Sequence, residues 1–394
     1  MDKVIPLSIP NFEGNEKLYV DKALEEGWVS TGGAYINQLE ESIAQFLKVP
    51  SAVACQSGTA GLHLAMIEAG VQPNDYVIVP TLTFIAAVNP VHYQFAEPIF
   101  MDCDDSLCLD AKKLKIFCEQ ECYIKEENLI YRKTERIIKA VVVVHVFGNM
   151  ADMEAIMEIA KKYKLKVIED ATEALGTVYT TGEYKGKYAG TIGDFGVFSF
   201  NGNKIITTGG GGMIIASSEK DLKHIKYLST QAKDDTLYYV HNEIGYNYRM
   251  TNLQAALGVA QMEELPEFIR RKNQNFELYK KYLEECKQVH LLPFRKEILS
   301  NKWFYSLVIE KDIVQKSLEY FITKLKEKGI MTRPIWGLIH EQLPYKNCIT
   351  YQIEQALFYK QRILNIPCST NITEEEIAYV SENIKNLCEG AEND

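Results

Sequence analysis

The sequence predicts an α/β fold in which a large, mostly parallel sheet domain is followed by a smaller α+β domain. Strands and helices alternate over about the first two-thirds of the chain, as in parallel sheets with crossover helices. The stretch "AVVVVHVFG" (140–148) is apolar almost throughout, which indicates a strand covered on both faces. The pattern changes after Thr251. We therefore expect a large domain over 1–250, whose N-terminal segment is free to pack against the second domain over 251–394.

The first strand–helix unit is expected near residue 50. "SAVAC" (51–55) has the pattern of a buried strand, and a helix is expected over 57–70, with Ser57 as its start signal and Gly70 as its stop signal. Further strands are predicted at 75–80, 97–102, 140–148 and 165–170, and an amphipathic helix capped by Asp152 at 152–164. Right-handed crossovers would join these strands into one sheet.

A charged stretch at 111–140 is longer than a simple crossover needs. We interpret it as a helix followed by a small polar hairpin, in the form of a surface insertion. After Thr251, a long helical stretch over 252–286 is expected to be interrupted by Pro266. The smaller domain then contains a strand at 303–310 and helices at 317–330 and 373–387.

Composition excludes several classes of protein. The chain has 394 residues, is 46% hydrophobic, and carries a formal net charge of −10. A protein that binds nucleic acid or anionic membranes generally would show the opposite sign. No stretch of about 18 apolar residues is present, and the first residues do not resemble a signal peptide. The nine cysteines include no CxxC pair, so we expect reduced thiols, no metal site and a cytoplasmic location.

Ser57, Gly58 and Thr59 lie where a strand passes into a helix. The first amides of a helix lack internal partners and carry the positive end of its dipole, so small residues there let a phosphate approach. An ordinary helix cap is the alternative interpretation of these residues.

Two acids lie at the end of the strand predicted at 165–170 and just after it. Asp170 ends "LKVIED", and ligands of open α/β sheets bind outside the carboxyl ends of the strands. A carboxylate there can hold a cationic ring nitrogen. The alternative for Asp170, and for Glu173 three residues later, is a capping role in the segment that follows.

Lys204 lies between apolar segments in "SFNGNKIITTGGGGMI" (199–214). Burial lowers the pKa of a lysine and makes its amine a better nucleophile, although a lysine that reaches the surface is the alternative. The four glycines, Gly209 to Gly212, are followed by a strand pattern and not by a helix, so they predict a turn between two strands and not a nucleotide loop.

The phosphate site, strand-end acid and apolar-flanked lysine occur in the order that a pyridoxal phosphate enzyme requires. The lysine forms a Schiff base, the acid keeps the pyridine nitrogen protonated, and the backbone amides take the phosphate.

With these residues in view, the chain resembles the DegT/DnrJ/EryC1/StrS sugar aminotransferases, a branch of the fold-type I pyridoxal phosphate enzymes. The stretches that carry the resemblance are "GWVSTGGAYINQLEESIAQFL" (27–47), "SGTAGLHLAM" (57–66), "VPTLTFIAAVNPV" (79–91), "VHVFGNMADM" (144–153), "IEDATEALG" (168–176), "GDFGVFSFNGNKIITTGGGGMI" (193–214) and "GYNYRMTNLQAALG" (245–258). Nearly the whole chain is covered.

The resemblance implies roles for individual residues. Lys204 matches the Schiff-base lysine, Asp170 the partner of the pyridine nitrogen, and Glu173 a neighbour of the cofactor that is Gln in many relatives. The positions matching the ring-stacking aromatic and the phosphate contacts are Phe84, Gly58, Thr59, Ser199 and Asn247. Asn247 matches a residue that reaches the phosphate of the neighbouring subunit, so the resemblance implies a homodimer with shared active sites.

The implied reaction transfers an amino group from L-glutamate to the C4 ketone of a nucleotide-linked 4-keto-6-deoxy sugar. The stretches "PTLTFIA" and "TRPIWGLIH" (332–340) resemble the branch that acts on N-acetylhexosamines in bacillosamine or legionaminic acid pathways, with perosamine synthases as close neighbours. Some relatives have histidine at the lysine position and act as dehydratases, and Lys204 argues against that reaction here. A non-catalytic regulatory or binding protein that keeps the fold is a third alternative, but such a protein is expected to lose Lys204 or Asp170, and both are present.

Five residues are candidates for contacts with the substrate. Arg249 and Arg333 are candidates for the diphosphate, because a guanidinium forks onto phosphate oxygens, but structural ion pairs are an equal alternative. His145 ends a strand on the ligand side, with a core histidine as its alternative. Trp336 and His340 are expected to shape the pocket for the acceptor sugar.

Overall fold

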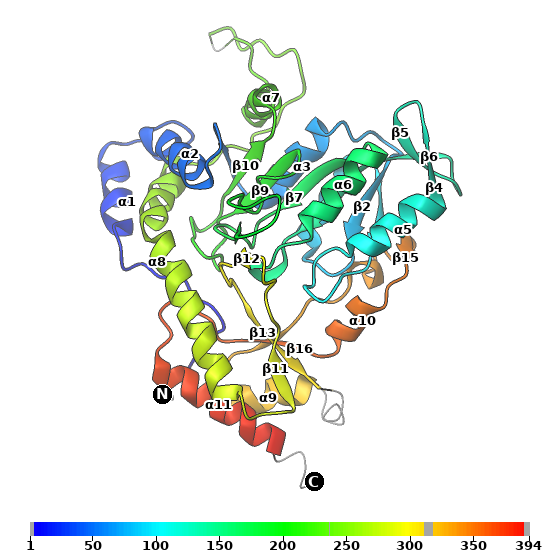
Figure 1. Ribbon diagram of the computed structural model, residues 1–394. Coiled ribbons are helices and arrows are strands. Elements are labelled where there is room, and N and C mark those ends of the chain that lie inside the picture. The colour runs from blue at the N-terminus through cyan, green and yellow to red at the C-terminus, as the bar shows by residue number, and fades with distance from the viewer. Residues whose placement is uncertain (1–3, 236, 311–317, 390–394) are drawn as a thin grey trace.

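A computed structural model describes residues 4–235, 237–310 and 318–389 (Figure 1). Its largest feature is a ten-stranded mixed sheet, in the order β1-β10-β9-β7-β6-β2-β3-β15 with β4 and β5 attached at β6. The strands are β1 Val53–Cys55, β2 Tyr76–Pro80, β3 Glu97–Met101, β4 Cys122–Lys125, β5 Asn128–Tyr131, β6 Arg136–Val144, β7 Lys166–Asp170, β9 Phe195–Ser199, β10 Gly212–Ala216 and β15 Ile349–Tyr351.

The central part of this sheet is parallel. Every pairing along the order from β9 to β15 is parallel, whereas β10 runs antiparallel to both β1 and β9. The central residues of β2, β6 and β7 are fully buried, which explains the apolar sequence of β2 and the apolar run over 140–144 in β6. The predicted α/β fold with a large, mostly parallel sheet is confirmed.

Helices pack around the sheet. They are α1 Glu16–Glu25, α2 Ala34–Leu47, α3 Gly58–Glu68, α4 Asn89–Tyr93, α5 Ala111–Glu121, α6 Met153–Tyr163 and α7 Glu219–Ser229, with 3₁₀ turns at Ile85–Ala87 and Val146–Gly148. The two predicted helix caps are present: the Ser57 hydroxyl accepts from the Ala60 amide, and the Asp152 carboxylate accepts from the Ala155 amide. Each cap satisfies an amide that the helix itself leaves without a partner.

The stretch at 111–140 contains the expected helix and hairpin, but it is more than a surface insertion. After α5, strands β4 and β5 form an antiparallel hairpin, and β5 continues into antiparallel pairing with the start of β6. Leu129, Ile130 and Tyr131 are buried by this pairing. The hairpin therefore extends the large sheet, because its second strand is apolar enough to pack on the core.

The long helix α8, Asn252–Leu283, is not interrupted at Pro266. A proline removes one hydrogen bond from a helix and crowds the preceding turn, which is why a break is expected from sequence. Here the helix lies against α1 and α2 at one end and against the C-terminal helix at the other, and Leu265 and Phe268 are buried beside the proline. Tertiary packing thus holds the helix together, and Figure 1 shows it running from the large sheet to the smaller domain.

The smaller domain is built on an antiparallel sheet in the order β11-β13-β16-β14. Its elements are β11 Val289–Leu291, β13 Tyr305–Ile309, β14 Arg333–Pro334, β16 Ile363–Ile366, α9 Leu318–Glu327 and α11 Glu374–Glu389. The predicted strand and both predicted helices are present, except that Ser317 lies outside the described residues. A 3₁₀ turn at Ile339–Glu341 and α10 at Gln355–Lys360 complete this part, and β12 at Ile298–Leu299 pairs with β8 at Val178–Tyr179.

Each half of the chain contributes a segment that packs against the other half. The Ile5 amide donates to the Gly329 carbonyl, so the N-terminal segment lies against the smaller domain. In the other direction, β15 pairs in parallel with β3 and forms an edge of the large sheet, although it comes from the C-terminal half. Within the described residues, no helix is long and apolar enough to cross a membrane.

Gly196 tests how tightly β9 is packed. A Cβ atom at this position would lie 1.8 Å from the Gly190 carbonyl oxygen, so Gly196→Ala forces backbone atoms apart. We expect the free energy of unfolding to fall by at least about 2 kcal/mol, measured by urea unfolding. Gly202→Ala is the control, because a Cβ there meets nothing within 4 Å. Equal stability of both variants would contradict the described packing.

Candidate active site

The candidate site forms where the parallel strands end. Asp170 is the last residue of β7, and Ser199 is the last residue of the neighbouring strand β9. Residues 200–211 then form a loop before β10, and Lys204 lies in this loop. Because parallel strands end at the same edge, the acid and the lysine are brought together as predicted from the order of the motifs.

Lys204 occupies a nearly buried position between an acid and an aromatic ring. Its Nζ lies 3.5 Å from Glu173 Oε1, and the two side chains are 12% and 4% exposed. The same Nζ lies 4.0 Å from the centre of the Trp303 ring, within the range of a cation–π interaction. The Trp303 indole N–H donates to the Asn203 carbonyl at 2.7 Å, which fixes the ring beside the lysine loop.

Two buried carboxyl groups face this lysine. Burial raises the pKa of Glu173 to about 7, although Lys204 and the Phe147 amide, which donates to Glu173 Oε2 at 2.9 Å, favour the charged form. Burial also raises the pKa of Asp170, against the opposing effects of Thr172, Lys204 and His145. The Asp170 carboxylate accepts from the Thr172 amide, and no helix is assigned to the residues directly after it. Helix capping therefore does not account for either acid.

The start of α3, which we call the anion cradle, offers backbone amides as donors. The Ser57 hydroxyl satisfies the Ala60 amide, and the amides of Gly58 and Thr59 fall in the first turn, where a helix offers no partner. A Cβ on Gly58 would lie 2.9 Å from Thr172 Cγ2 and 3.1 Å from Ser199 Cβ, so only glycine lets α3 begin this close to the ends of β7 and β9.

Gly212 is the first residue of β10 rather than part of the preceding turn. A Cβ on it would lie 2.7 Å from the Ser57 carbonyl carbon and 2.8 Å from the Gly58 nitrogen. The glycine run thus lets β10 pass directly behind the anion cradle.

His145 lies beneath the site and not within it. Its side chain is fully buried, with Nε2 at 2.8 Å from Glu169 and Nδ1 accepting from the Ala151 amide at 3.2 Å. Glu169 also accepts from the amides of Gly190, Ile192 and Gly193. Both ring nitrogens of His145 are occupied within the protein, so the structure favours the core interpretation over a contact with substrate.

Three predicted residues lie on segments next to the end of β2 or next to Phe147. Phe84 follows β2 and is 55% exposed, which leaves its ring free to cover a ligand. His340 Nδ1 lies 2.5 Å from Thr81 Oγ1, and the Ile339 amide donates to the Thr81 carbonyl, so this segment docks beside the end of β2. Trp336 packs on Phe147 at 4.7 Å between ring centres, next to the Glu173 contact.

The remaining predicted residues are not in contact with Lys204 in the described chain. Arg333 is exposed on β14, opposite Asn365. Arg249 donates to Gln231 at 3.1 Å and to Asn247 at 3.4 Å. The Tyr248 carbonyl accepts from the Gln56 amide, so this segment lies near the cradle but forms a separate group.

Sequence reasoning missed Trp303 and the residue that holds it. Asn301 donates to the carbonyls of Glu173 and Leu175, and its own Oδ1 accepts from the Trp303 amide at 3.0 Å. This links the aromatic wall directly to the acid. The only signal in the sequence is a tryptophan at the start of an apolar strand, which more commonly indicates core packing.

The residues present fit pyridoxal phosphate. The nearly buried lysine supplies an amine, the buried Asp170 an acid for a ring nitrogen, and the first amides of α3 donors for a phosphate. In the described residues, no group of three or more His, Cys, Asp or Glu is arranged to hold a metal ion.

Comparisons with known proteins agree with this description. Residues 10–385 match the DegT/DnrJ/EryC1/StrS aminotransferase family. The chain is 37% identical over 385 residues to GDP-perosamine synthase of Escherichia coli O157:H7, covering 97% of this chain and 98% of the relative. It is 34% identical over 394 residues to the putative pyridoxal phosphate-dependent aminotransferase EpsN of Bacillus subtilis (strain 168), covering 98% and 96%.

Among solved structures, the PLP-form of the putative sugar aminotransferase Spr1654 from Streptococcus pneumoniae is similar with a TM-score of 0.86. That match covers 99% of this chain and 100% of the other at 24% identity, so it supports the fold alone.

Replacing Glu173 by Gln should change how stability depends on pH. The raised pKa of about 7 means that the folded protein keeps a proton on Glu173 that the unfolded protein releases near the ordinary glutamate pKa of 4.5. The stability contributed by this proton is present below pH 4.5 and is lost as pH rises through 7, amounting to roughly 3 kcal/mol.

Glutamine has no proton to lose, so Glu173→Gln removes this loss of stability. Between about pH 5 and pH 8, the free energy of unfolding of the variant should therefore rise relative to that of the wild type by the same amount. Urea unfolding of protein freed of pyridoxal phosphate measures the difference. A difference that does not change with pH would contradict the proposed state of Glu173.

Proposed function

The chain belongs to the DegT/DnrJ/EryC1/StrS aminotransferase family, and we propose from this that it moves the amino group of L-glutamate to the C4 ketone of a nucleotide-linked 4-keto-6-deoxy sugar. The family and its relatives make the chain a pyridoxal phosphate-dependent sugar aminotransferase of fold type I, with pyridoxal 5′-phosphate as its cofactor. The observation that carries the proposal is the Lys204 amine, held between Glu173 and Trp303 at the edge of the sheet.

The proposed cofactor contacts are made by residues of the candidate active site. Lys204 would hold the cofactor covalently, Asp170 would pair with its ring nitrogen, and Phe84 would cover its ring. Ser57, Gly58, Thr59 and Ser199 would bind its phosphate, together with Asn247 of a second subunit. Bound pyridoxal phosphate supplies an electron sink for the carbon that exchanges its proton.

The protein's own groups then move protons. Once the amino donor has displaced it, the Lys204 amine is free to take the proton from the donor's α-carbon. In the second half of the reaction it returns a proton to C4 of the sugar. One group serving both halves at one site implies ping-pong kinetics. Glu173 and Trp303 hold the amine in place, because each contacts Nζ directly.

The proposed acceptor is a 4-keto-6-deoxy-N-acetylhexosamine, as in the bacillosamine and legionaminic acid pathways that lead to cell-surface polysaccharides. Its support is the resemblance of the stretches at 80–86 and 332–340. A perosamine-type acceptor is the second candidate, favoured by the 37% identity to a GDP-perosamine synthase. In either case Arg333 and Arg249 are proposed to bind the diphosphate, and Trp336 and His340 to border the sugar.

We further propose that the active enzyme is a cytoplasmic homodimer. The segment after α7 extends beyond the rest of the molecule (Figure 1) and exposes Leu237, Tyr238, Tyr239 and Ile244, with Tyr238 77% and Ile244 87% exposed. An apolar patch of this kind marks a protein contact, and a second copy of the chain is the partner that its continuity with Asn247 supports.

A panel of substrates tests the reaction. Purified wild-type protein should be yellow and should convert a nucleotide-linked 4-keto-6-deoxy sugar to its 4-amino sugar with one glutamate consumed per product, measured by mass spectrometry. UDP- and GDP-linked sugars, with and without a 2-acetamido group, distinguish the two acceptors. Lys204→Ala should lower the rate by roughly 10²–10⁴-fold or more. A colourless protein that binds no added pyridoxal phosphate would rule out the proposal.

The dimer is tested by Tyr238→Ser combined with Ile244→Ser. The wild type should have twice the 44.9 kDa mass of the chain by light scattering, and the double variant should dissociate towards single chains, because it loses the proposed apolar contact. Leu343→Ser is the control, since Leu343 is also 77% exposed but lies elsewhere. An unchanged mass in the double variant would argue against this surface as the interface.

A further inference from the structure

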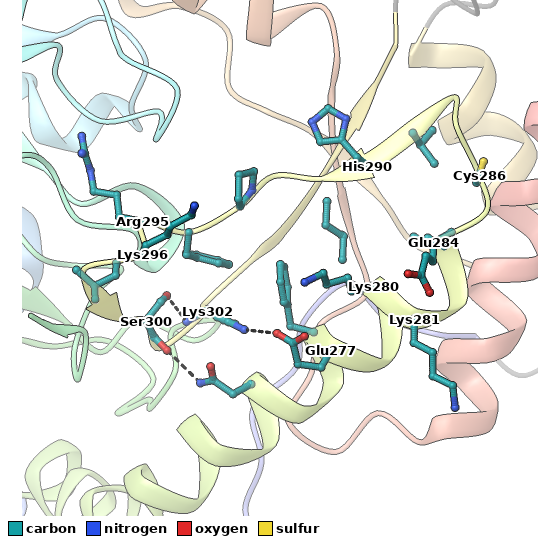
Figure 2. Close-up of a pocket in the computed structure, with 18 of the residues that line it drawn as sticks. Glu277, Lys280, Lys281, Glu284, Cys286, His290, Arg295, Lys296, Ser300 and Lys302 are labelled. Carbon is teal, nitrogen blue, oxygen red and sulfur yellow. Dashed lines mark hydrogen bonds and ion pairs between the residues drawn. The ribbon is translucent and has the colours of Figure 1, made fainter. Parts of the chain in front are cut away.

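A second cleft lies on the smaller domain, away from Lys204. It has a volume of about 770 Å³ and lies between the C-terminal half of α8 and the segment from β11 to Lys302 (Figure 2). This is within the usual range of pockets that hold small molecules. None of the residues that we place in the proposed active site lines it.

The cleft is strongly basic for an acidic protein. Six lysine and arginine side chains line it, with only two glutamates, Glu277 and Glu284, whereas the whole chain has a net charge of −10. Figure 2 shows Lys280, Lys302 and Glu277 converging from α8 and the opposing segment. No described carboxylate pairs with Lys280 or with Lys296 on the facing wall. This concentration of one charge attracts anions.

Lys302 is the most buried of these cations. Its side chain is 11% exposed, lies 4.1 Å from the centre of the Phe276 ring, and has Glu277 as its ion-pair partner at 3.2 Å. Burial and the repulsion from Lys280 lower the pKa of Lys302, against the pull of Glu277. One exposed glutamate thus faces two close ammonium groups, which leaves positive charge to be matched by a ligand.

The facing wall also carries apolar side chains beside its cations. Pro293, Phe294 and Leu299 line the cleft on the segment that returns towards β13, and Leu299 is exposed. A simple inorganic anion would use only the lysines. A ligand with phosphates at one end and a flat aromatic ring at the other would use both surfaces.

The cleft and the active site share one short segment. Ser300 and Lys302 line the cleft, whereas Asn301 and Trp303 contact Glu173 and the lysine loop on the other side. Lys302 adopts a left-handed backbone conformation with φ of 48°, which non-glycine residues rarely take. Arg295 also ties the cleft wall to Asp104 of the large domain.

We propose that this cleft is a second ligand site, separate from the Lys204 site, which binds a nucleoside diphosphate with its phosphates on Lys280, Lys296 and Lys302 and its base against Pro293, Phe294 and Leu299. This inference goes beyond the proposed reaction and does not require a particular acceptor sugar.

Calorimetric titration of the holoenzyme with UDP and with GDP tests the site. The double variant Lys280→Glu, Lys296→Glu should weaken binding of the preferred nucleotide at least ten-fold, because both exposed lysines become carboxylates. Lys326→Glu is the matched control on α9, with the same type of charge change outside the cleft, and it should bind as the wild type does. Absence of binding by the wild type, or equal binding by all three proteins, would overturn the proposal.

Two further binding measurements distinguish this site from the active site. Arg333→Ala should retain the cleft binding, because Arg333 belongs to the proposed acceptor site. Binding that is lost in Arg333→Ala and kept in the cleft variant would overturn the proposal while leaving the aminotransferase assignment in place. Inorganic pyrophosphate should bind at least ten-fold more weakly than the nucleotide, and equal affinity would overturn the contact proposed for the base.

Discussion

The site depends on the ion pair between Lys204 and Glu173. A lone ammonium group in this nearly buried position would have a desolvation cost of several kcal/mol, and so would a lone carboxylate. At 3.5 Å each group offsets part of the other's cost, and the Trp303 ring adds about 0.5–2 kcal/mol on the open side of the lysine. Burial nonetheless outweighs the attraction of Lys204 and raises the pKa of Glu173 to about 7.

The rest of the architecture holds these groups in place. The parallel strands β7 and β9 bring Asp170 and Ser199 to one edge, and the antiparallel strand β10 closes the loop that carries Lys204. Beneath them, the buried pair of His145 and Glu169 fixes the backbone of the 190–193 loop. The large sheet therefore sets the positions of the charged groups, while residues 300–303 bring the aromatic wall from the smaller domain.

Much of this was predictable from the sequence, for specific physical reasons. Buried parallel strands have continuous apolar sequences, and Ser57 and Asp152 are local caps whose partners lie three residues away. Asp170 and Lys204 were identified from motif order and family resemblance. The contact of Trp303 with Lys204 was not predictable, because it joins residues about 100 positions apart through the fold of the smaller domain. The unbroken passage of α8 through Pro266 likewise depends on neighbouring helices and not on local sequence.

The helix α8 joins the two halves of the chain into one packed structure, because it belongs to the core of both. Its first half packs on α1 and α2, its second half on α11, and the buried apolar residues of both parts form one continuous core. Strand β15 ties the parts together a second time by completing the large sheet from the C-terminal half. The boundary at Thr251 is therefore a change of sequence pattern and not a weak joint. Separating the two halves would expose buried apolar surface on both, because α8 and β15 each contribute to the packing of both.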